Sequence, residues 1–184
     1  MSNDAAAPTP PKAEDGVFCV TASSIIHAPI EKVWKTLLDF PSYPEWNPFV
    51  RKQVITDKNW KPIPDQTPKV GSYLHMTVHI PPSLTDHGSI PTQTTKEVIT
   101  FIDHDNHRVA WRYISLPKWA LSAERWQYLT EVDDEGKKKV KYETQEVFSG
   151  PLAYVVKWWT GRDLKKAFDA FGEALKKRSE ESEL

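Results

Sequence analysis

The chain has 184 residues, of which 39% are hydrophobic and 11% aromatic, and it includes 8 tryptophans. This length fits one domain, and the aromatic content suits either a large core or an aromatic-lined pocket. The net charge of −1 creates no global field that favours nucleic acid or an anionic membrane. The single Cys19 excludes an intramolecular disulfide, and no apolar run reaches the ~20 residues that span a bilayer. With no signal-peptide pattern, these features predict a cytoplasmic protein without integral membrane association.

The N-terminal third predicts a strand, then a helix, then either a tight turn or a single helical turn. Residues 1–16 offer almost nothing to bury and are expected to be a disordered tail, whereas residues 17–26 are rich in β-formers and predict the first strand. Pro29 suits a first helical turn, and Pro41 ends the helix before it. The apolar stripe of this helix has the spacing i, i+3, i+4, i+7, i+8 and consists of Ile30, Val33, Trp34, Leu37 and Leu38. Residues 42–48 then predict a tight turn or a single helical turn, and residues 50–55 are extended.

Three segments carry a family resemblance. The first contains Ala28-Pro29, Val33-Trp34, Asp39-Phe40, Tyr43 and residues 45–49; the second is 146–150, and the third is an amphipathic helix at 167–178. In this order and spacing they resemble the SRPBCC (START/Bet v 1-like) superfamily, and within it the polyketide cyclase/dehydrase-like members. The resemblance covers roughly residues 17–179 and leaves 180–184 as a frayed acidic end.

The resemblance implies an α+β helix-grip fold. In this fold a curved antiparallel sheet of about six or seven strands wraps around a long C-terminal α-helix, with two short helices after the first strand. An apolar cavity lies between the sheet and the long helix. The scaffold hosts carriers, receptors, cyclases and chaperone activators, so the fold alone does not name one function.

The middle of the chain alternates proline-rich loops, at 57–69 and 81–92, with strand-like segments. In the strand predicted at 72–80, the apolar positions that should face the cavity are Leu74, Met76, Val78 and Ile80. The other predicted strands cover 94–102, 108–114, 122–132 and 138–149. Trp111 and Tyr113 share the inner face of their strand, where they contact either a ligand or each other.

The histidines predict no metal site. His75 and His79 lie on the outer face of their strand, roughly 13 Å apart at ~3.3 Å per residue. That separation is too large for one metal ion, so both are expected to be solvated. His104 and His107 fall in a turn and are expected to be exposed.

The turn between the last two strands decides which side chains face the cavity. A two-residue turn at Glu135-Gly136 places Arg125 opposite Glu146. A three-residue turn with a glycine bulge instead places Trp126 and Tyr128 on the face of Glu146. The pattern of residues leaves both registers open. The resemblance favours the first, because family members place their pocket-lining positions at Arg125, Gln127, Leu129, Glu146 and Phe148.

In the first register, Arg125 and Glu146 face each other inside the cavity. A buried lone charge is costly, so each requires the other or a polar group of a ligand. The two therefore form either a self-satisfied ion pair or a recognition site. In a site, Arg125 could clamp a carboxylate, enolate or phenolate, and Glu146 could act as a general base if burial raises its pKa.

The C-terminal segment, 151–178, carries two apolar arcs that point roughly 110° apart at ~100° per residue. A straight helix cannot bury both, which predicts a kink or break at Thr160-Gly161. Trp158 or Trp159 would then either point at the cavity mouth or seal the end of the core.

These patterns yield a candidate site and three functions. Arg125 and Glu146 are the candidate catalytic residues, and the candidate ligand-binding residues are Trp46, Phe49, Met76, Val78, Trp111, Tyr113, Gln127, Tyr142, Phe148, Trp158 and Phe168. We expect a carrier or binding protein for a hydrophobic or aromatic small molecule of the polyketide, lipid or isoprenoid class. The alternatives are a polyketide cyclase/dehydrase-type enzyme and a protein-interaction module of the chaperone-activator type. No cofactor, metal or nucleic acid is expected: phosphate-cradling motifs are absent, the histidines predict no metal site, and the charge distribution does not favour nucleic acid.

Overall fold

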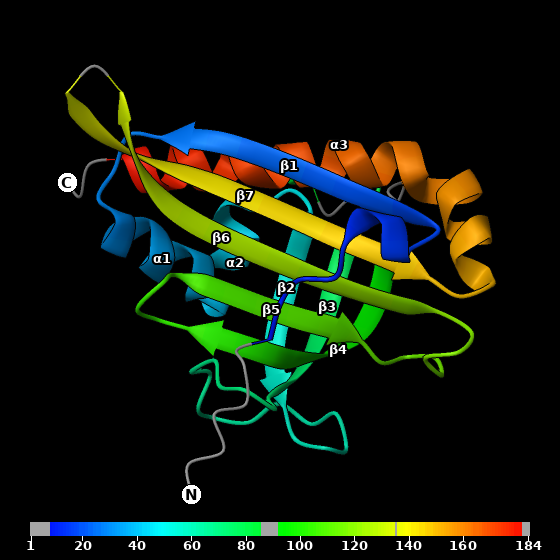
Figure 1. Ribbon diagram of the computed structural model, residues 1–184. Helices are drawn as coiled ribbons and strands as arrows, with labels where there is room; N and C mark the ends of the chain where they lie inside the picture. The colour runs from blue at the N-terminus through cyan, green and yellow to red at the C-terminus, as the bar shows by residue number, and fades with distance from the viewer. Residues whose placement is uncertain (1–7, 86–91, 135, 182–184) are drawn as a thin grey trace, which may run out of the picture.

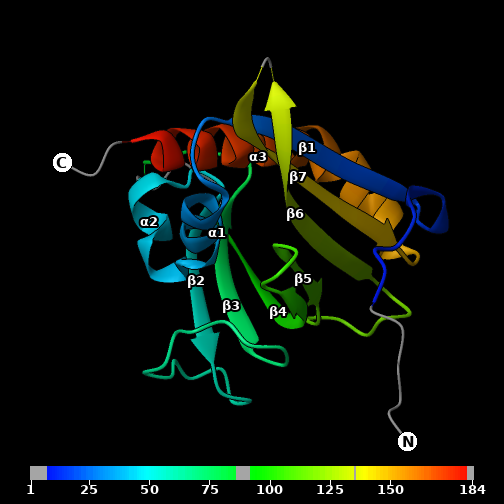
Figure 2. The same cartoon turned by 60° about the vertical axis from the view of Figure 1, so that its left-hand side comes forward.

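A computed structural model describes residues 8–85, 92–134 and 136–181. Within these ranges one antiparallel sheet of seven strands, in the order β1-β7-β6-β5-β4-β3-β2, forms the framework (Figure 1). The strands are β1 (Phe18–Ile26), β2 (Val50–Thr56), β3 (Tyr73–His79), β4 (Thr92–Asp103), β5 (Arg108–Tyr113), β6 (Ser122–Asp134) and β7 (Lys137–Ser149). The sheet curls beneath the long helix α3 (Leu152–Glu180), as Figure 2 shows. This arrangement confirms the expected helix-grip fold.

Two short helices follow β1, the first as the apolar spacing predicted and both as the resemblance implied. Helix α1 (Ile30–Leu38) buries Val33, Trp34 and Leu37, the stripe expected of an amphipathic helix. A 3₁₀ turn, η2 (Phe40–Ser42), and the single helical turn α2 (Tyr43–Trp46) come next. The Tyr43 hydroxyl donates a 2.6 Å hydrogen bond to the Leu37 carbonyl oxygen, which ties α2 back to α1.

Helix α3 is hydrogen-bonded without a break from Leu152 to Glu180. Of the two alternatives predicted at Thr160-Gly161, a kink or a break, the break is therefore wrong. The helix does bend: Figure 1 shows the first turns of α3 (orange) at an angle to the remainder. The Thr160 hydroxyl donates to the Val156 carbonyl oxygen at 3.0 Å, a contact that bends helices without ending them.

The β6–β7 hairpin has the two-residue-turn register. Arg125 pairs with Glu146 and Asp134 with Lys137, so the register that the resemblance favoured is confirmed. Glu135 itself lies outside the described residues. Because successive side chains of a strand point to opposite faces, this register places Arg125, Gln127 and Leu129 on the concave face and Trp126 and Tyr128 on the convex one.

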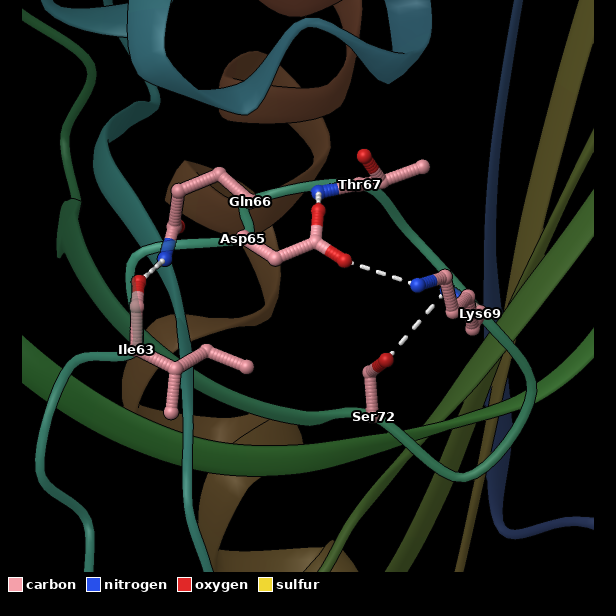
Figure 3. Close-up of polar contacts among 6 residues, drawn as sticks. All are labelled: Ile63, Asp65, Gln66, Thr67, Lys69 and Ser72. Carbon is pink, nitrogen blue, oxygen red and sulfur yellow. Dashed lines mark hydrogen bonds and ion pairs between the residues drawn. The ribbon is translucent and has the colours of Figure 1, made fainter.

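The proline-rich loop after β2 protects that edge strand. The Gln66 side-chain amide accepts a hydrogen bond from the Ile55 N–H at 2.9 Å and donates to the Ile55 carbonyl at 3.0 Å. It thus takes the place of a neighbouring strand at an unpaired edge. Figure 3 shows its further 2.6 Å bond to the Ile63 carbonyl and the 2.7 Å ion pair between Asp65 and Lys69.

Replacing Gln66 by alanine should lower the free energy of unfolding by about 1–2 kcal/mol. The Ile55 N–H loses its partner, and the Ile55 carbonyl keeps only the 3.2 Å hydrogen bond from the Ile63 N–H. Urea denaturation followed by circular dichroism measures this change. Lys69→Ala is the matched control in the same loop. Its exposed ion pair should contribute well under ~1 kcal/mol, so equal losses for the two variants would contradict the role assigned to Gln66.

Several local expectations are revised. His79 is buried, with its Nδ1 3.0 Å from the Ser83 carbonyl oxygen, and is not a solvated histidine. His107 is half-buried because its ring packs edge-on against Trp34 and contacts Glu31 at 3.0 Å. The expected tail is described from residue 8 onward, where the Pro11 carbonyl accepts a 2.9 Å hydrogen bond from Gln145; residues 1–7 and 182–184 lie outside the described ranges. No helix in the described part of the chain is long and apolar enough to cross a membrane.

Candidate functional site

A cavity of about 240 Å³ lies between the concave face of the sheet and α3. Most of its wall is apolar. The expected residues that line it are Phe49, Met76, Val78, Trp111, Tyr113, Arg125, Glu146 and Phe148. Ile80, which was expected to face the cavity, also lines it, whereas Leu74 does not. The lining residues that the sequence reasoning did not name are Gln93, Thr94, Thr95, Glu97, Leu121, Ala123, Val156 and Leu164.

Arg125 projects from β6 and is 3% exposed. Its guanidinium carbon lies 4.1 Å from the ring centroid of Phe168 and 4.9 Å from that of Phe171. Stacking of this kind suits a planar, weakly hydrated cation. Its Nε donates to the Thr144 hydroxyl at 3.1 Å, and its Nη2 lies 3.5 Å from the Tyr142 hydroxyl.

Arg125 and Glu146 are cross-strand partners, yet they form no ion pair. Among the described residues, no carboxylate oxygen lies within 4.0 Å of the Arg125 guanidinium nitrogens. The interpretation of the two as a self-satisfied ion pair is therefore wrong. The hydrogen-bonding and stacking partners of the guanidinium are neutral, and its positive charge acts on the Glu146 and Glu97 carboxyls without direct contact.

Two carboxyl groups share the cavity with Arg125. Burial raises the pKa of Glu146 to about 7, against a smaller opposing effect of the Arg125 charge. Burial also raises the pKa of Glu97 to about 8, and the negative charge of Glu146 raises it further. The Thr95 hydroxyl donates to Glu97 at 3.2 Å and favours its charged form. Near neutral pH, such groups can both donate and accept protons.

The sequence reasoning did not identify Glu97 as a cavity residue, because its strand has the pattern of an ordinary amphipathic segment. The signal that locates it is register: Glu97 pairs with Tyr113, and Ile99 with Trp111. Both partners were expected on the inner face. A register shift between Ile99 and Phe101 interrupts the alternation of β4, so counting by two along the strand does not identify the inward set.

Five expected ligand-binding residues do not line the cavity. Trp46 packs on Tyr43 and Phe171, because the α2 turn directs it to the helix end of the core. Gln127 and Tyr142 hydrogen-bond to each other at 2.7 Å. Phe168 is stacked on Arg125, and Trp158 is 82% exposed. Gln127, Tyr142 and Phe168 support Arg125, and Trp158 faces outward from α3.

Metal chemistry has no obvious ligands here. The described residues contain no group of three or more histidine, cysteine, aspartate or glutamate side chains able to hold a metal ion. What the cavity offers instead is one cation, two carboxyls of raised pKa and an apolar wall. This set can orient an apolar molecule by its oxygen atoms and can exchange protons with it.

Comparison with known proteins agrees with this geometry. Residues 17–180 match the family described as polyketide cyclase / dehydrase and lipid transport. The oxopyrrolidines biosynthesis cluster protein O of Penicillium oxalicum is 31% identical over 172 residues, covering 83% of this chain and 82% of that protein.

Solved structures share the fold at low identity. A hypothetical protein from Helicobacter pylori superposes with a TM-score of 0.69 at 16% identity, covering 97% of this chain and 99% of that one. Truncated norcoclaurine synthase from Thalictrum flavum superposes with a TM-score of 0.56 at 16% identity, covering 90% of this chain and 94% of that one. A START superfamily protein from Mycobacterium smegmatis superposes with a TM-score of 0.52 at 15% identity, covering 85% of this chain and 98% of that one. With its helix-grip architecture and a family match over nearly its whole length, the chain belongs to the polyketide cyclase/dehydrase and lipid transport family of the SRPBCC superfamily.

Proposed function

We propose that the protein binds a compact hydrophobic or aromatic small molecule, of the polyketide, lipid or isoprenoid class, as a carrier or binding protein. The observation that supports this is an apolar cavity in which Arg125 has no carboxylate partner among the described residues. A guest with an anionic or strongly polar oxygen would complete the hydrogen bonding of the guanidinium. At about 240 Å³ the cavity is smaller than the roughly 300–1,000 Å³ of typical ligand pockets, which favours a ring system over a long chain.

Native mass spectrometry of freshly purified protein tests this proposal, and titration with naphthoate, a two-ring carboxylate, supplies an affinity. Ala123→Phe should abolish a copurified guest and weaken naphthoate binding tenfold or more, because the new ring occupies the cavity. An extra ring in a filled core would cost about 1–3 kcal/mol. Here the free energy of unfolding should change little, because the ring enters empty space.

Thr21→Phe is the matched control, since Thr21 is exposed on β1 and lies outside the cavity lining. It adds the same ring and should leave naphthoate binding unchanged. If Ala123→Phe binds naphthoate like the unmodified protein, the guest does not occupy this cavity and the proposal fails.

A second candidate function is catalysis of the cyclase/dehydrase type on a molecule held in the same cavity. The raised pKa values of Glu146 and Glu97, about 7 and 8, favour it. Arg125 would stabilise a developing enolate, and the carboxyls would transfer protons. An enzyme should convert its copurified guest to a product of changed mass, for example by loss of water, and Glu146→Gln should stop this while retaining the guest. A carrier should leave the mass of the guest unchanged, both in the unmodified protein and in Glu146→Gln.

The third candidate, a protein-interaction module, requires a filled interior and a large exposed apolar patch. The described residues leave the interior hollow, which argues against this as the main role. An exposed apolar patch is nevertheless present beside the cavity.

A further inference from the structure

Six large apolar side chains form an exposed surface at one end of the molecule, here called the aromatic rim. It consists of Trp119, Leu152, Tyr154, Val155, Trp158 and Trp159. Three of these are tryptophans with exposed fractions of 77%, 82% and 75% for Trp119, Trp158 and Trp159. The Leu152 N–H donates to the Ala120 carbonyl at 3.0 Å, which joins the loop that holds Trp119 to the start of α3. Trp158 does not seal the end of the core and is not part of the cavity lining.

The aromatic rim is continuous with the wall of the cavity. Val156 on α3 lines the cavity, as does Leu121 beside the Trp119 loop. At ~100° per residue, Leu152, Val156 and Trp159 fall within about 60° of one another on the helix. Val155, Trp158 and Tyr154 extend the same apolar arc outward. One face of the first turns of α3 thus runs from the cavity to solvent without a polar break.

Positive charge surrounds this apolar surface. Residues 115–121 and 151–166 carry Lys118, Lys157, Arg162, Lys165 and Lys166 against the single Asp163, a local net charge of +4 in a chain whose total is −1. Lys165 and Lys166 are paired with Asp169 and Asp163. Lys118, Lys157 and Arg162 make no ion pair with any described residue. The whole-chain charge conceals this local excess.

We propose that the aromatic rim docks the protein on the surface of an anionic lipid bilayer. Tryptophan and tyrosine, apolar bodies with a polar edge, suit the membrane interface. Lysine and arginine beside them can extend to lipid phosphates. A second copy of this chain fits poorly, because a symmetric dimer would place the two cationic surfaces against each other. Docking would set the cavity mouth against the lipid, so an apolar guest could pass between them without crossing water.

Cosedimentation with lipid vesicles tests the proposal on the full chain. The protein should bind vesicles of phosphatidylcholine containing phosphatidylserine, with a blue shift of tryptophan fluorescence, and more weakly those of phosphatidylcholine alone. Trp158→Ala/Trp159→Ala should reduce partitioning roughly tenfold or more, since binding scales with buried apolar area. Val70→Ser/Ile25→Thr is the control, because both residues are exposed apolar side chains outside the rim; it should bind as the unmodified protein does.

A second pair of variants separates charge from apolar burial. Lys157→Gln/Arg162→Gln should weaken binding to the anionic vesicles severalfold and reduce its salt dependence. Lys58→Gln/Lys61→Gln, which removes two exposed charges from the loop after β2, should not. Loss of vesicle binding only in the rim variants, with unchanged circular dichroism, supports docking.

Three results would overturn the proposal: no binding of the unmodified protein to anionic vesicles, equal binding by the tryptophan variant, or a concentration-dependent dimer that the tryptophan variant abolishes. Because vesicle binding needs no guest in the cavity, this test is independent of naphthoate binding and of Ala123→Phe. Either proposal can therefore fail while the other stands.

Discussion

Replacing Arg125 by methionine should lower the affinity for naphthoate by about 100-fold while the fold persists. A hydrogen bond to a charged group contributes about 1.5–3 kcal/mol, and each 1.4 kcal/mol corresponds to a tenfold change in affinity. The guanidinium is held by Thr144, Tyr142 and aromatic rings, without a carboxylate among the described residues. The loss should therefore come directly from the missing partner of the ligand carboxylate.

Two controls isolate the charge. Naphthoate methyl ester should bind the Arg125→Met variant and the unmodified protein with similar affinity, because it carries no carboxylate. Arg125→Lys should show an intermediate loss, since an ammonium keeps the charge but lacks the planar fork. Isothermal titration calorimetry measures the affinities of the unmodified protein and of both Arg125 variants for the acid and for the ester. An equal loss for acid and ester would show that the substitution damages the cavity and would remove Arg125 from ligand recognition.

The same substitution should not destabilise the protein. Methionine is apolar and flexible enough to fill the space beside Phe168 and Phe171. Replacing a buried charge by an apolar side chain is often neutral or stabilising. We expect the melting temperature to stay constant or rise by a few degrees, a pattern typical of a residue kept for function and not for folding.

Local patterns were sufficient to predict most elements of this fold. The stripe of Val33, Trp34 and Leu37 predicted α1, and the alternation of Met76 and Val78 predicted β3 with its inward face. Residue pattern alone left the hairpin register open, because both turns bury apolar side chains. The family resemblance favoured the register that the structure has, because that register matches the pocket-lining positions of other members.

The charges of the site were harder to predict than its apolar wall. Arg125 and Glu146 were found through register, but Glu97 depends on a strand irregularity that no residue type marks. The absence of an ion pair depends on the direction of the Arg125 side chain, which Thr144 on β7 and Phe168 and Phe171 on α3 determine together. The position of Trp158 was predicted wrongly for a related reason: α3 bends without a break, and the apolar arc of its first turns, which includes Leu152 and Trp159, is left in solvent.

Raising the pH from about 5 to 9 should lower the contribution of the cavity carboxyls to stability. In the unfolded chain a glutamate has its ordinary pKa of 4.5, whereas the folded values are about 7 for Glu146 and about 8 for Glu97. Between these values the folded state binds more protons than the unfolded state, so its free energy of unfolding falls as pH rises. The decline should begin above pH 4.5 and level off above pH 8.

Glu97→Gln should remove part of this slope. At pH 8.5 or above the variant should be more stable than the unmodified protein by about 1–3 kcal/mol, given ~1.4 kcal/mol per pKa unit. This corresponds to a rise in melting temperature of roughly 2–4 °C per kcal/mol for a chain of this size. At pH 5 the two should unfold alike. Glu131→Gln, an exposed carboxylate on β6, is the control and should leave the slope unchanged.

The same protonation should govern ligand binding. With both carboxyls neutral, Arg125 alone sets the charge of the cavity, and naphthoate should bind most tightly below about pH 7. As Glu146 and then Glu97 ionise, repulsion should weaken naphthoate binding, while the methyl ester should be almost insensitive to pH. Glu97→Gln/Glu146→Gln should bind naphthoate with a flat pH profile between pH 6 and 9. A profile that still falls in this variant would place the titrating group outside the cavity and refute the coupling of these carboxyls to the guest.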